Sequence, residues 1–142
     1  METHKILINA CFGGFSVSYK ALQLYYQRKY NQKLYFYKSI NWDGDYVRCK
    51  LEEAESAFTA DLGEHYNKYE ENHSDTYVSK YSFDRTDPVL IEIVEELGKE
   101  ANGPYADLKV VTIKGNKYRI NEYDGYESIE TPYTIKWDII KD

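Results

Sequence analysis

The residues best suited to chemistry stand where a short apolar run meets two glycines, in the segment NACFGGF that begins at Asn9. Gly13 and Gly14 carry no Cβ, so backbone N–H groups around them can approach a ligand, and a helix that starts nearby adds partial positive charge. Asn9 and Cys11 bring polar side chains to the carboxyl end of the apolar run, where sites of α/β proteins tend to lie. The segment predicts either a loop that binds an anion or a nucleotide, or a tight turn that binds nothing. The phosphate-binding patterns GxxxxGK[ST] and GxGxxG are both absent.

Cys11 has a second interpretation, as a nucleophile activated by the start of the following helix. A phosphatase-like loop requires an arginine six residues after the cysteine, and Val17 stands at that position. Cysteine is more often simply buried. We therefore expect Cys11 to be a half-buried thiol that contacts the site, and we predict no catalytic residue.

A second group of candidates lies just before a predicted helix, in the segment DRTDP at residues 84–88. The planar guanidinium of Arg85 is suited to a phosphate or a carboxylate. In a nucleotide-binding protein, Asp87, Glu122 or Asp124 would contact the ribose or act as a base. The alternative is a structural ion pair, in which Arg85 binds Glu122 or Asp124 and fixes the loop.

A third group lies in the segment NEYDGYE at residues 121–127. Its Asp-Gly dipeptide tolerates positive φ and predicts a hairpin turn. The turn gathers Glu122, Tyr123 and Asp124, which could meet a ligand or a partner at the end of the sheet. If the ends of the elements lie at one edge, the polar residues of all three groups line one pocket. These residues are Asn9, Cys11, Arg85, Asp87, Tyr123 and Asp124.

The elements that position these residues follow from capping and hydrophobic periodicity. Ser16 or Ser18 can cap a helix that runs to about residue 30. Asp87 caps a second helix, which ends where Gly103 takes the left-handed conformation. Apolar or alternating runs predict strands at residues 5–10, 34–40, 77–83, 108–113, 118–123 and 126–130, with further alternation over 133–139.

This order of elements predicts an α+β fold, a mostly antiparallel sheet with two main helices packed on one face. The 142 residues are enough for a single domain with its own core. Residues 41–76 are interpreted as an insertion between two core halves, with a turn at 41–45 and an exposed connection at 65–75.

Charge and composition narrow the classes of function. The chain has 24 acidic and 18 basic residues, a net charge of −6, and 16 tyrosines. A net acidic chain repels a phosphate backbone, so direct binding of nucleic acid is not expected. Tyrosine supplies a large contact area at small entropic cost, which favours a protein partner with a basic groove. No cofactor or metal is expected, since the His and Cys residues match no zinc spacing.

The sequence also bears on localisation. No apolar run approaches the roughly 20 residues of a membrane-spanning helix, and the first residues do not form a signal peptide. We expect a cytoplasmic protein that does not bind membranes.

Three separated strings resemble one family. The string ILINACFGGFSVS at residues 6–18 is similar to the opening of small phage and prophage proteins of uncharacterised function, which begin with IN-x-C-[YF]-GGF-x-x-S. The strings RTDPVLIEIVEELG at 85–98 and EYDGYE at 122–127 are similar to later parts of that family, whereas residues 31–80 depart from it. The resemblance implies a viral accessory protein, in the cytoplasm of the host cell. Such proteins often block host defence, as anti-CRISPR proteins do, by capping a nuclease or by sequestering a signalling nucleotide.

Two functions are therefore expected. In the first, the protein inhibits a host defence protein, such as a CRISPR nuclease, by binding it through an acidic, tyrosine-rich surface. In the second, it is a small nucleotide-binding protein or enzyme that uses Gly13, Gly14 and Arg85. A structural phage protein with no pocket is a third alternative, and a homodimer fits any of them.

Overall fold

The computed structural model describes residues 2–39, 46–53, 58–63, 76–134 and 136–141. These described residues include two α-helices and two short 3-10 helices, which are α1 (Tyr19–Tyr30), α2 (Pro88–Leu97), η1 (Leu51–Glu53) and η3 (Gly98–Ala101). The strands are β1 (Thr3–Asn9), β2 (Tyr35–Ser39), β3 (Tyr46–Cys49), β4 (Phe58–Asp61), β5 (Tyr77–Val78), β6 (Leu108–Lys114), β7 (Arg119–Tyr123) and β8 (Tyr126–Glu130).

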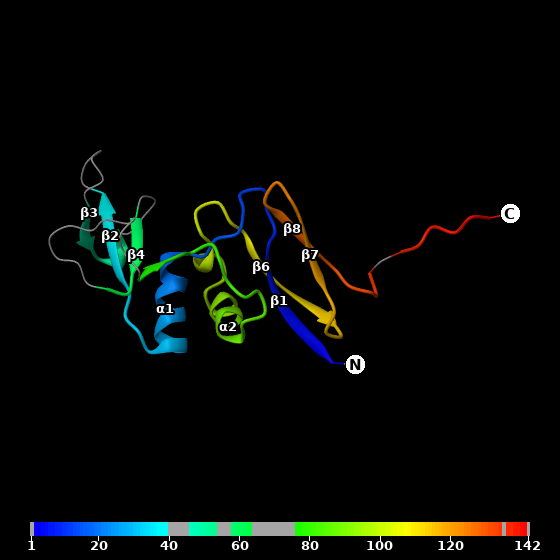
Figure 1. The fold of residues 1–142 in the computed structure, drawn as a ribbon, viewed down its shortest axis with the longest axis horizontal. Helices are drawn as coiled ribbons and strands as arrows, with labels where there is room; N and C mark the ends of the chain where they lie inside the picture. The colour runs from blue at the N-terminus through cyan, green and yellow to red at the C-terminus, as the bar shows by residue number, and fades with distance from the viewer. Residues whose placement is uncertain (1, 40–45, 54–57, 64–75, 135, 142) are drawn as a thin grey trace.

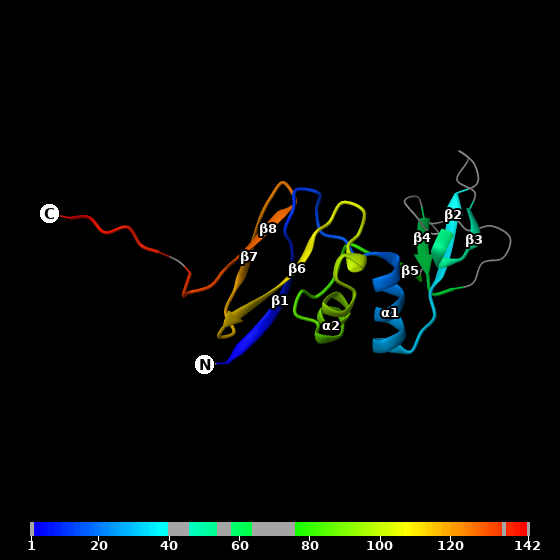
Figure 2. The same cartoon turned by 180° about the vertical axis from the view of Figure 1, so that it is seen from behind.

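Every pairing between these strands is antiparallel, and the predicted α+β fold is confirmed. The strands form three sheets, with the orders β3-β2-β4-β5, β1-β6 and β7-β8. Figures 1 and 2 show the helices α1 and α2 side by side, between the four-stranded sheet and the β1-β6 pair. The β7-β8 hairpin lies beyond β1 and β6 on the side away from the helices.

The apolar run at residues 6–8 is buried because both faces of β1 are covered. Leu7 packs into the main core with the helices, where Leu22 and Leu90 are also fully buried. Ile6 and Ile8 point the other way, into a smaller core beneath the β7-β8 hairpin. Successive side chains of a strand alternate between faces, so a strand buried on both faces needs a continuous apolar run.

Helix α1 begins and ends as its sequence predicts. The Ser18 Oγ accepts a hydrogen bond from the Ala21 N–H at 3.1 Å, so Ser18 rather than Ser16 is the N-cap. Asn31 ends the helix in the left-handed conformation, with φ of 51°, and its N–H donates to the Gln27 carbonyl.

Helix α2 begins at the predicted cap but ends earlier than predicted. Asp87 caps its first turn through the Val89 N–H. The positive φ that ends the helix belongs to Gly98, at 58°, and the prediction of a left-handed Gly103 is wrong. Gly103 instead allows a close approach, because a Cβ there would lie 1.8 Å from the Ser16 Oγ.

The described part of residues 41–76 belongs to a sheet that packs on the core. Strands β3 and β4 flank β2 on its two sides, with Phe36 opposite Cys49 on one and Ala60 on the other. Both Phe36 and Ala60 are members of the main core. The predicted turn at 41–45 and the predicted connection at 65–75 fall outside the described residues.

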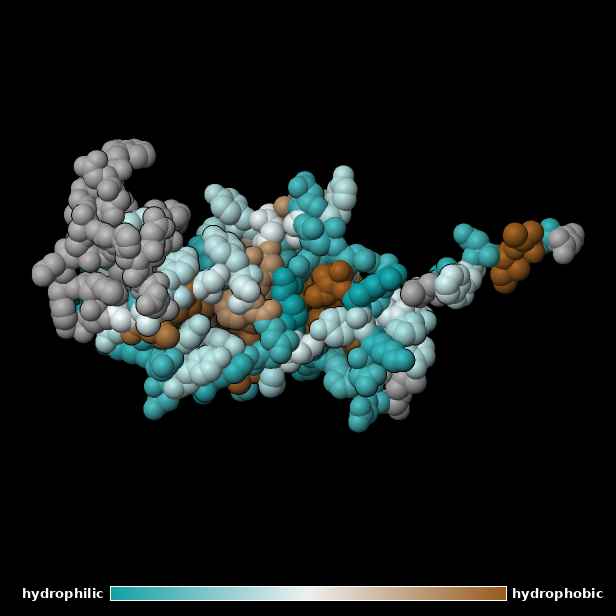
Figure 3. Space-filling view, in the orientation of Figure 1, coloured by the Kyte–Doolittle hydropathy of each residue, from teal (hydrophilic) through white to brown (hydrophobic). Residues whose placement is uncertain are grey.

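Two predicted strands differ from the structure. Strand β5 covers only residues 77 and 78 of the predicted 77–83, and the backbone carbonyl of Lys80 then accepts a hydrogen bond from the Val17 N–H. The alternating stretch 133–139 forms no ladder within the described residues, and 136–141 extend away from the body (Figure 1). Figure 3 shows hydrophobic residues near the end of this extension, where Ile139 and Ile140 are 83% and 91% exposed. No helix among the described residues is long and apolar enough to cross a membrane.

Candidate functional site

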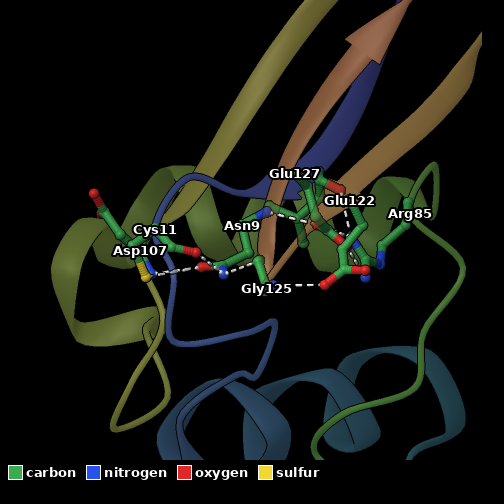
Figure 4. Close-up of polar contacts among 8 residues, drawn as sticks. Asn9, Cys11, Arg85, Asp107, Glu122, Gly125 and Glu127 are labelled. Carbon is green, nitrogen blue, oxygen red and sulfur yellow. Dashed lines mark hydrogen bonds and ion pairs between the residues drawn. The ribbon is translucent and has the colours of Figure 1, made fainter.

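Asn9, the last residue of β1, is fully buried and uses its whole side-chain amide (Figure 4). Its Nδ2 donates to the carbonyls of Cys11 and Gly125, both at 2.9 Å, and its Oδ1 accepts from the Asp107 N–H at 2.8 Å. The Cys11 Sγ donates to the Tyr105 carbonyl at 3.1 Å. Asn9 therefore holds together the loop after β1, the segment before β6 and the turn between β7 and β8, because each donates to or accepts from the same amide.

Arg85 and Glu127 form a largely buried ion pair beside Asn9 (Figure 4). The guanidinium contacts both carboxylate oxygens, at 2.5 Å and 2.9 Å, and its Nη1 also donates to the Leu7 carbonyl at 3.3 Å. The same Glu127 Oε1 accepts from the Asn9 N–H at 2.8 Å. The guanidinium stacks 3.6 Å from the ring centroid of Phe15. An anion that bound Arg85 would have to compete with a carboxylate already held in a two-point contact.

Glu127 is the central residue that sequence reasoning did not identify. The structural alternative for Arg85 named Glu122 or Asp124 as its partner, and the structure places Glu127 there instead. The available signal was the alternation of β8, since Glu127 and Ile129 share the inward face of that strand. A carboxylate on an inward face requires a cationic partner.

The two glycines of the loop after β1 serve its packing. A Cβ on Gly13 would lie 1.7 Å from the Tyr105 carbonyl oxygen, so only glycine fits against that backbone. Gly14 has φ of 90°, a conformation that side chains other than glycine rarely adopt. Gly125 closes the same junction, because a Cβ on it would lie 2.7 Å from the Gly14 nitrogen. The loop is therefore a close-packed turn against its neighbours.

Asp87 belongs to a different cluster, on the α1 side of α2. Its carboxylate accepts from the Val89 N–H at 2.9 Å and the Tyr25 hydroxyl at 2.7 Å, and it pairs with Lys29. Burial alone would raise the pKa of Asp87, but the hydrogen bonds from Lys29, Tyr25 and Val89 outweigh it and hold that pKa below its usual range. The pKa of Tyr25 is raised by burial and by its hydrogen bond to Asp87. The pKa of Lys29 is raised by its hydrogen bonds to Asp87 and Tyr25.

The β7-β8 turn forms as its sequence predicts, and its tip is exposed. Asp124 and Gly125 both have positive φ, at 50° and 88°. The Gly125 N–H donates to the Glu122 Oε1 at 2.5 Å, which fixes that side chain over the turn. Tyr123 is 78% exposed. Of the nine candidate residues, the structure gathers Asn9, Cys11, Gly13, Gly14, Arg85, Glu122, Tyr123 and Asp124 at one edge of the molecule and leaves Asp87 with α1.

Exposed aromatic side chains surround this end of the molecule. We call them the aromatic rim, which consists of Phe12, Tyr81, Tyr105, Tyr123 and Tyr126. The loop of residues 12–16 separates two hollows in the rim. One, of about 230 Å³, is lined by residues that include Gly13, Tyr81 and Tyr105. The other, of about 290 Å³, lies between Phe12, Tyr123 and Tyr126, and the rings of Phe12 and Tyr126 are 5.2 Å apart.

The charges next to the aromatic rim are mostly acidic. Asp107, Glu122 and Asp124 are exposed beside its aromatic rings. Lys80 is the basic residue that lines the smaller hollow, and it is half-buried over the ring of Tyr19 at 4.8 Å. Burial lowers the pKa of Lys80. The exposed charge at this edge is therefore negative.

A comparison of the chain with models of known protein families, with curated proteins and with solved structures finds no match.

The polar groups at this end divide into a buried set and an exposed set. Among the residues that the structure describes, no group of three His, Cys, Asp or Glu side chains could hold a metal ion. The buried polar groups Asn9, Arg85 and Glu127 are engaged with one another and with backbone groups. The exposed groups, in contrast, are aromatic rings and carboxylates that suit contact with another molecule.

Proposed function

We propose that the protein is an accessory protein of the phage type, which inhibits a host defence protein by binding it through the aromatic rim. The observation that carries the proposal is the gathering of five exposed aromatic side chains at one edge, beside the carboxylates of Asp107, Glu122 and Asp124. Tyrosine side chains are over-represented among residues that dominate binding energy. The carboxylates complement a basic groove, such as the nucleic-acid channel of a CRISPR nuclease.

The rigid support beneath the rim strengthens the proposal. The turn that carries Tyr123 and Tyr126 is tied to β1 through Asn9 and Glu127, and Tyr105 is packed against Gly13. A preorganised surface loses little conformational entropy when it binds, which favours affinity. The Asn9–Arg85–Glu127 cluster then acts as the support of an interface.

Binding to a panel of purified CRISPR nucleases, measured by biolayer interferometry, tests the proposal. We expect one nuclease to bind, with affinity that falls as salt concentration rises. The double variant Tyr105→Ala, Tyr123→Ala should weaken that binding by about tenfold or more, because interface tyrosines often contribute over 1 kcal/mol each. Tyr133→Ala is the matched control, since Tyr133 is 62% exposed but lies outside the aromatic rim.

The role of charge is tested separately with Glu122→Gln and Asp124→Asn. Gln retains an acceptor for the Gly125 N–H, and Asn tolerates the positive φ of position 124. The pair of substitutions should flatten the salt dependence of binding. If no nuclease in the panel binds, or if the tyrosine variant binds as tightly as the wild type, the proposal is wrong. Binding that does not depend on salt concentration would contradict the proposed contribution of the carboxylates.

A further inference from the structure

A groove lies at the end of α1 that is opposite to the aromatic rim. The charge of this groove differs from that of the aromatic rim. The larger part of the groove has a volume of about 580 Å³ and lies between α1, β2, β3 and η1. The smaller part, about 450 Å³, runs along the last turns of α1 and the residues after it. Gln23, Lys33 and Leu34 line both parts, so the two are continuous. Volumes of this order are typical of sites that bind small molecules.

The larger part of the groove is a cationic region on an acidic chain. Lys33, Arg48 and Lys50 line it, and two of them converge on the ring of Tyr35. The Lys33 Nζ is 5.3 Å from the ring centroid, and the Arg48 Cζ is 5.0 Å from it. Both contacts are of the cation–π type, so the ring of Tyr35 holds these two basic side chains beside the groove.

The acidic residues of the groove do not cancel this charge. Glu53 pairs with Lys38 outside the groove lining, at 3.0 Å, and Glu52 is exposed. Within the part of the chain that the structure describes, Lys33 and Lys50 have no carboxylate partner. Both ammonium groups can therefore bind a ligand without giving up an ion pair of the protein.

The smaller part of the groove presents amide side chains. Gln23 and Gln27 are four positions apart on α1 and lie on one face, and Asn31 and Gln32 follow the helix. An amide carries both a donor and an acceptor, which is the pattern that a nucleobase edge requires. The opposite face of α1, with Tyr25 and Lys29, is occupied by Asp87 of α2.

We infer that this groove binds a nucleotide, with the phosphates bound by Lys33 and Lys50 and the base against the amides of Gln23 and Gln27. Lysine and arginine side chains bind phosphate oxygens through charge-assisted hydrogen bonds. Leu34 lies at the floor of both parts, where it is 2% exposed and packs into the main core. The site is independent of the aromatic rim, so it stands if the proposed interface fails.

Isothermal titration calorimetry at low salt, with ATP, inorganic tripolyphosphate and adenosine as separate probes, tests the inference. We expect ATP to bind more tightly than either part alone. The double variant Lys33→Ala, Lys50→Ala should bind both ATP and tripolyphosphate about tenfold or more weakly than the wild type does. The double variant Gln23→Ala, Gln27→Ala should bind ATP more weakly, whereas its affinity for tripolyphosphate should stay within about twofold of the wild-type value.

The matched control is Lys109→Ala combined with Lys117→Ala, because both lysines are exposed and lie outside the groove. This control removes the same net charge and should bind ATP within about twofold of the wild type. Circular dichroism confirms that each variant is folded. Absence of ATP binding at about 1 mM overturns the inference. If the control variant loses as much affinity for ATP as the groove variant does, the groove is not the binding site. If tripolyphosphate binds as tightly as ATP, the ligand is not recognised as a nucleotide.

Discussion

The two ends of α1 carry opposite kinds of surface. At its start, the aromatic rim is acidic and rests on the buried Asn9–Arg85–Glu127 cluster. At its end, the groove is cationic and amide-lined, and its charged groups face solvent. The net charge of −6, which is a sum over the whole chain, does not reveal this difference. The difference teaches that the polar groups under the rim are engaged with one another, whereas Lys33 and Lys50 of the groove have no carboxylate partner among the described residues.

The sharpest test of this difference is Glu127→Ala, for which we expect the largest loss of stability. The substitution leaves the guanidinium of Arg85 and the N–H of Asn9 buried without their carboxylate. Removal of one partner of a buried ion pair costs about 3–5 kcal/mol. Urea unfolding followed by circular dichroism measures the loss. The combination Arg85→Met with Glu127→Gln retains an acceptor for Asn9 and should cost less than Glu127→Ala alone. A loss below about 1 kcal/mol in Glu127→Ala would show that the cluster does not support the rim.

The glycines of the loop offer a second test. Gly13→Ala should destabilise the protein by about 2 kcal/mol, because the new Cβ would overlap the Tyr105 carbonyl and the backbone must move. Gly14→Ala is the matched control, since no atom lies within 4 Å of its Cβ position and only the positive φ is unfavourable. We expect about 1 kcal/mol for that variant. Thermal unfolding of both variants shows which of them loses more stability. A larger loss of stability in Gly14→Ala would contradict the close packing of Gly13.

The cluster of Tyr25, Lys29 and Asp87 lies between the two ends and should respond to pH. Because the pKa of Asp87 is lowered in the folded protein, its contribution to stability is present above the usual aspartate pKa and is lost as the pH falls below about 4. The pKa values of Lys29 and Tyr25 are raised, so their contributions are present at neutral pH and are lost as the pH rises above about 10.

The variant Asp87→Asn isolates this response, since Asn is also a good N-cap and keeps the start of α2. We expect its urea midpoint to fall less steeply than that of the wild type between about pH 6 and pH 3. The loss at neutral pH should be about 1 kcal/mol. If the two curves run parallel throughout the acid range, Asp87 does not contribute to the pH dependence.

The smallest effect on stability is expected at the rim itself. Tyr105 and Tyr123 are each 78% exposed, so Tyr105→Ala with Tyr123→Ala should change the free energy of unfolding by less than about 0.5 kcal/mol. The double variant Lys33→Ala, Lys50→Ala of the groove should show an equally small change in the free energy of unfolding. Differential scanning calorimetry of both variants checks this, and a large loss in the rim variant would mean that its tyrosines serve the fold.

Several features were predictable because they depend on residues close together in the chain. The caps at Ser18 and Asp87 and the turn at Asp124 and Gly125 each involve groups within four residues of one another. The apolar stripe of α2 is likewise local, since its buried residues recur with the helical period. Of the nine candidate residues indicated by the sequence, eight lie together in the structure, because each stands at or beside the end of an element.

The partners of those residues depend on the tertiary structure. Arg85 and Glu127 are 42 positions apart, and the alternation of β8 puts Glu127 on an inward face but does not show that Arg85 is its partner. Likewise, Gly13 is required by the Tyr105 backbone, and the groove exists because β2 and β3 lie beside α1. Caps, turns and periodic stripes are decided within a few residues, where the chain has little conformational freedom. Ion pairs, close backbone approaches and grooves are decided only when distant segments pack together, because the energy that selects them comes from contacts absent in the isolated segment.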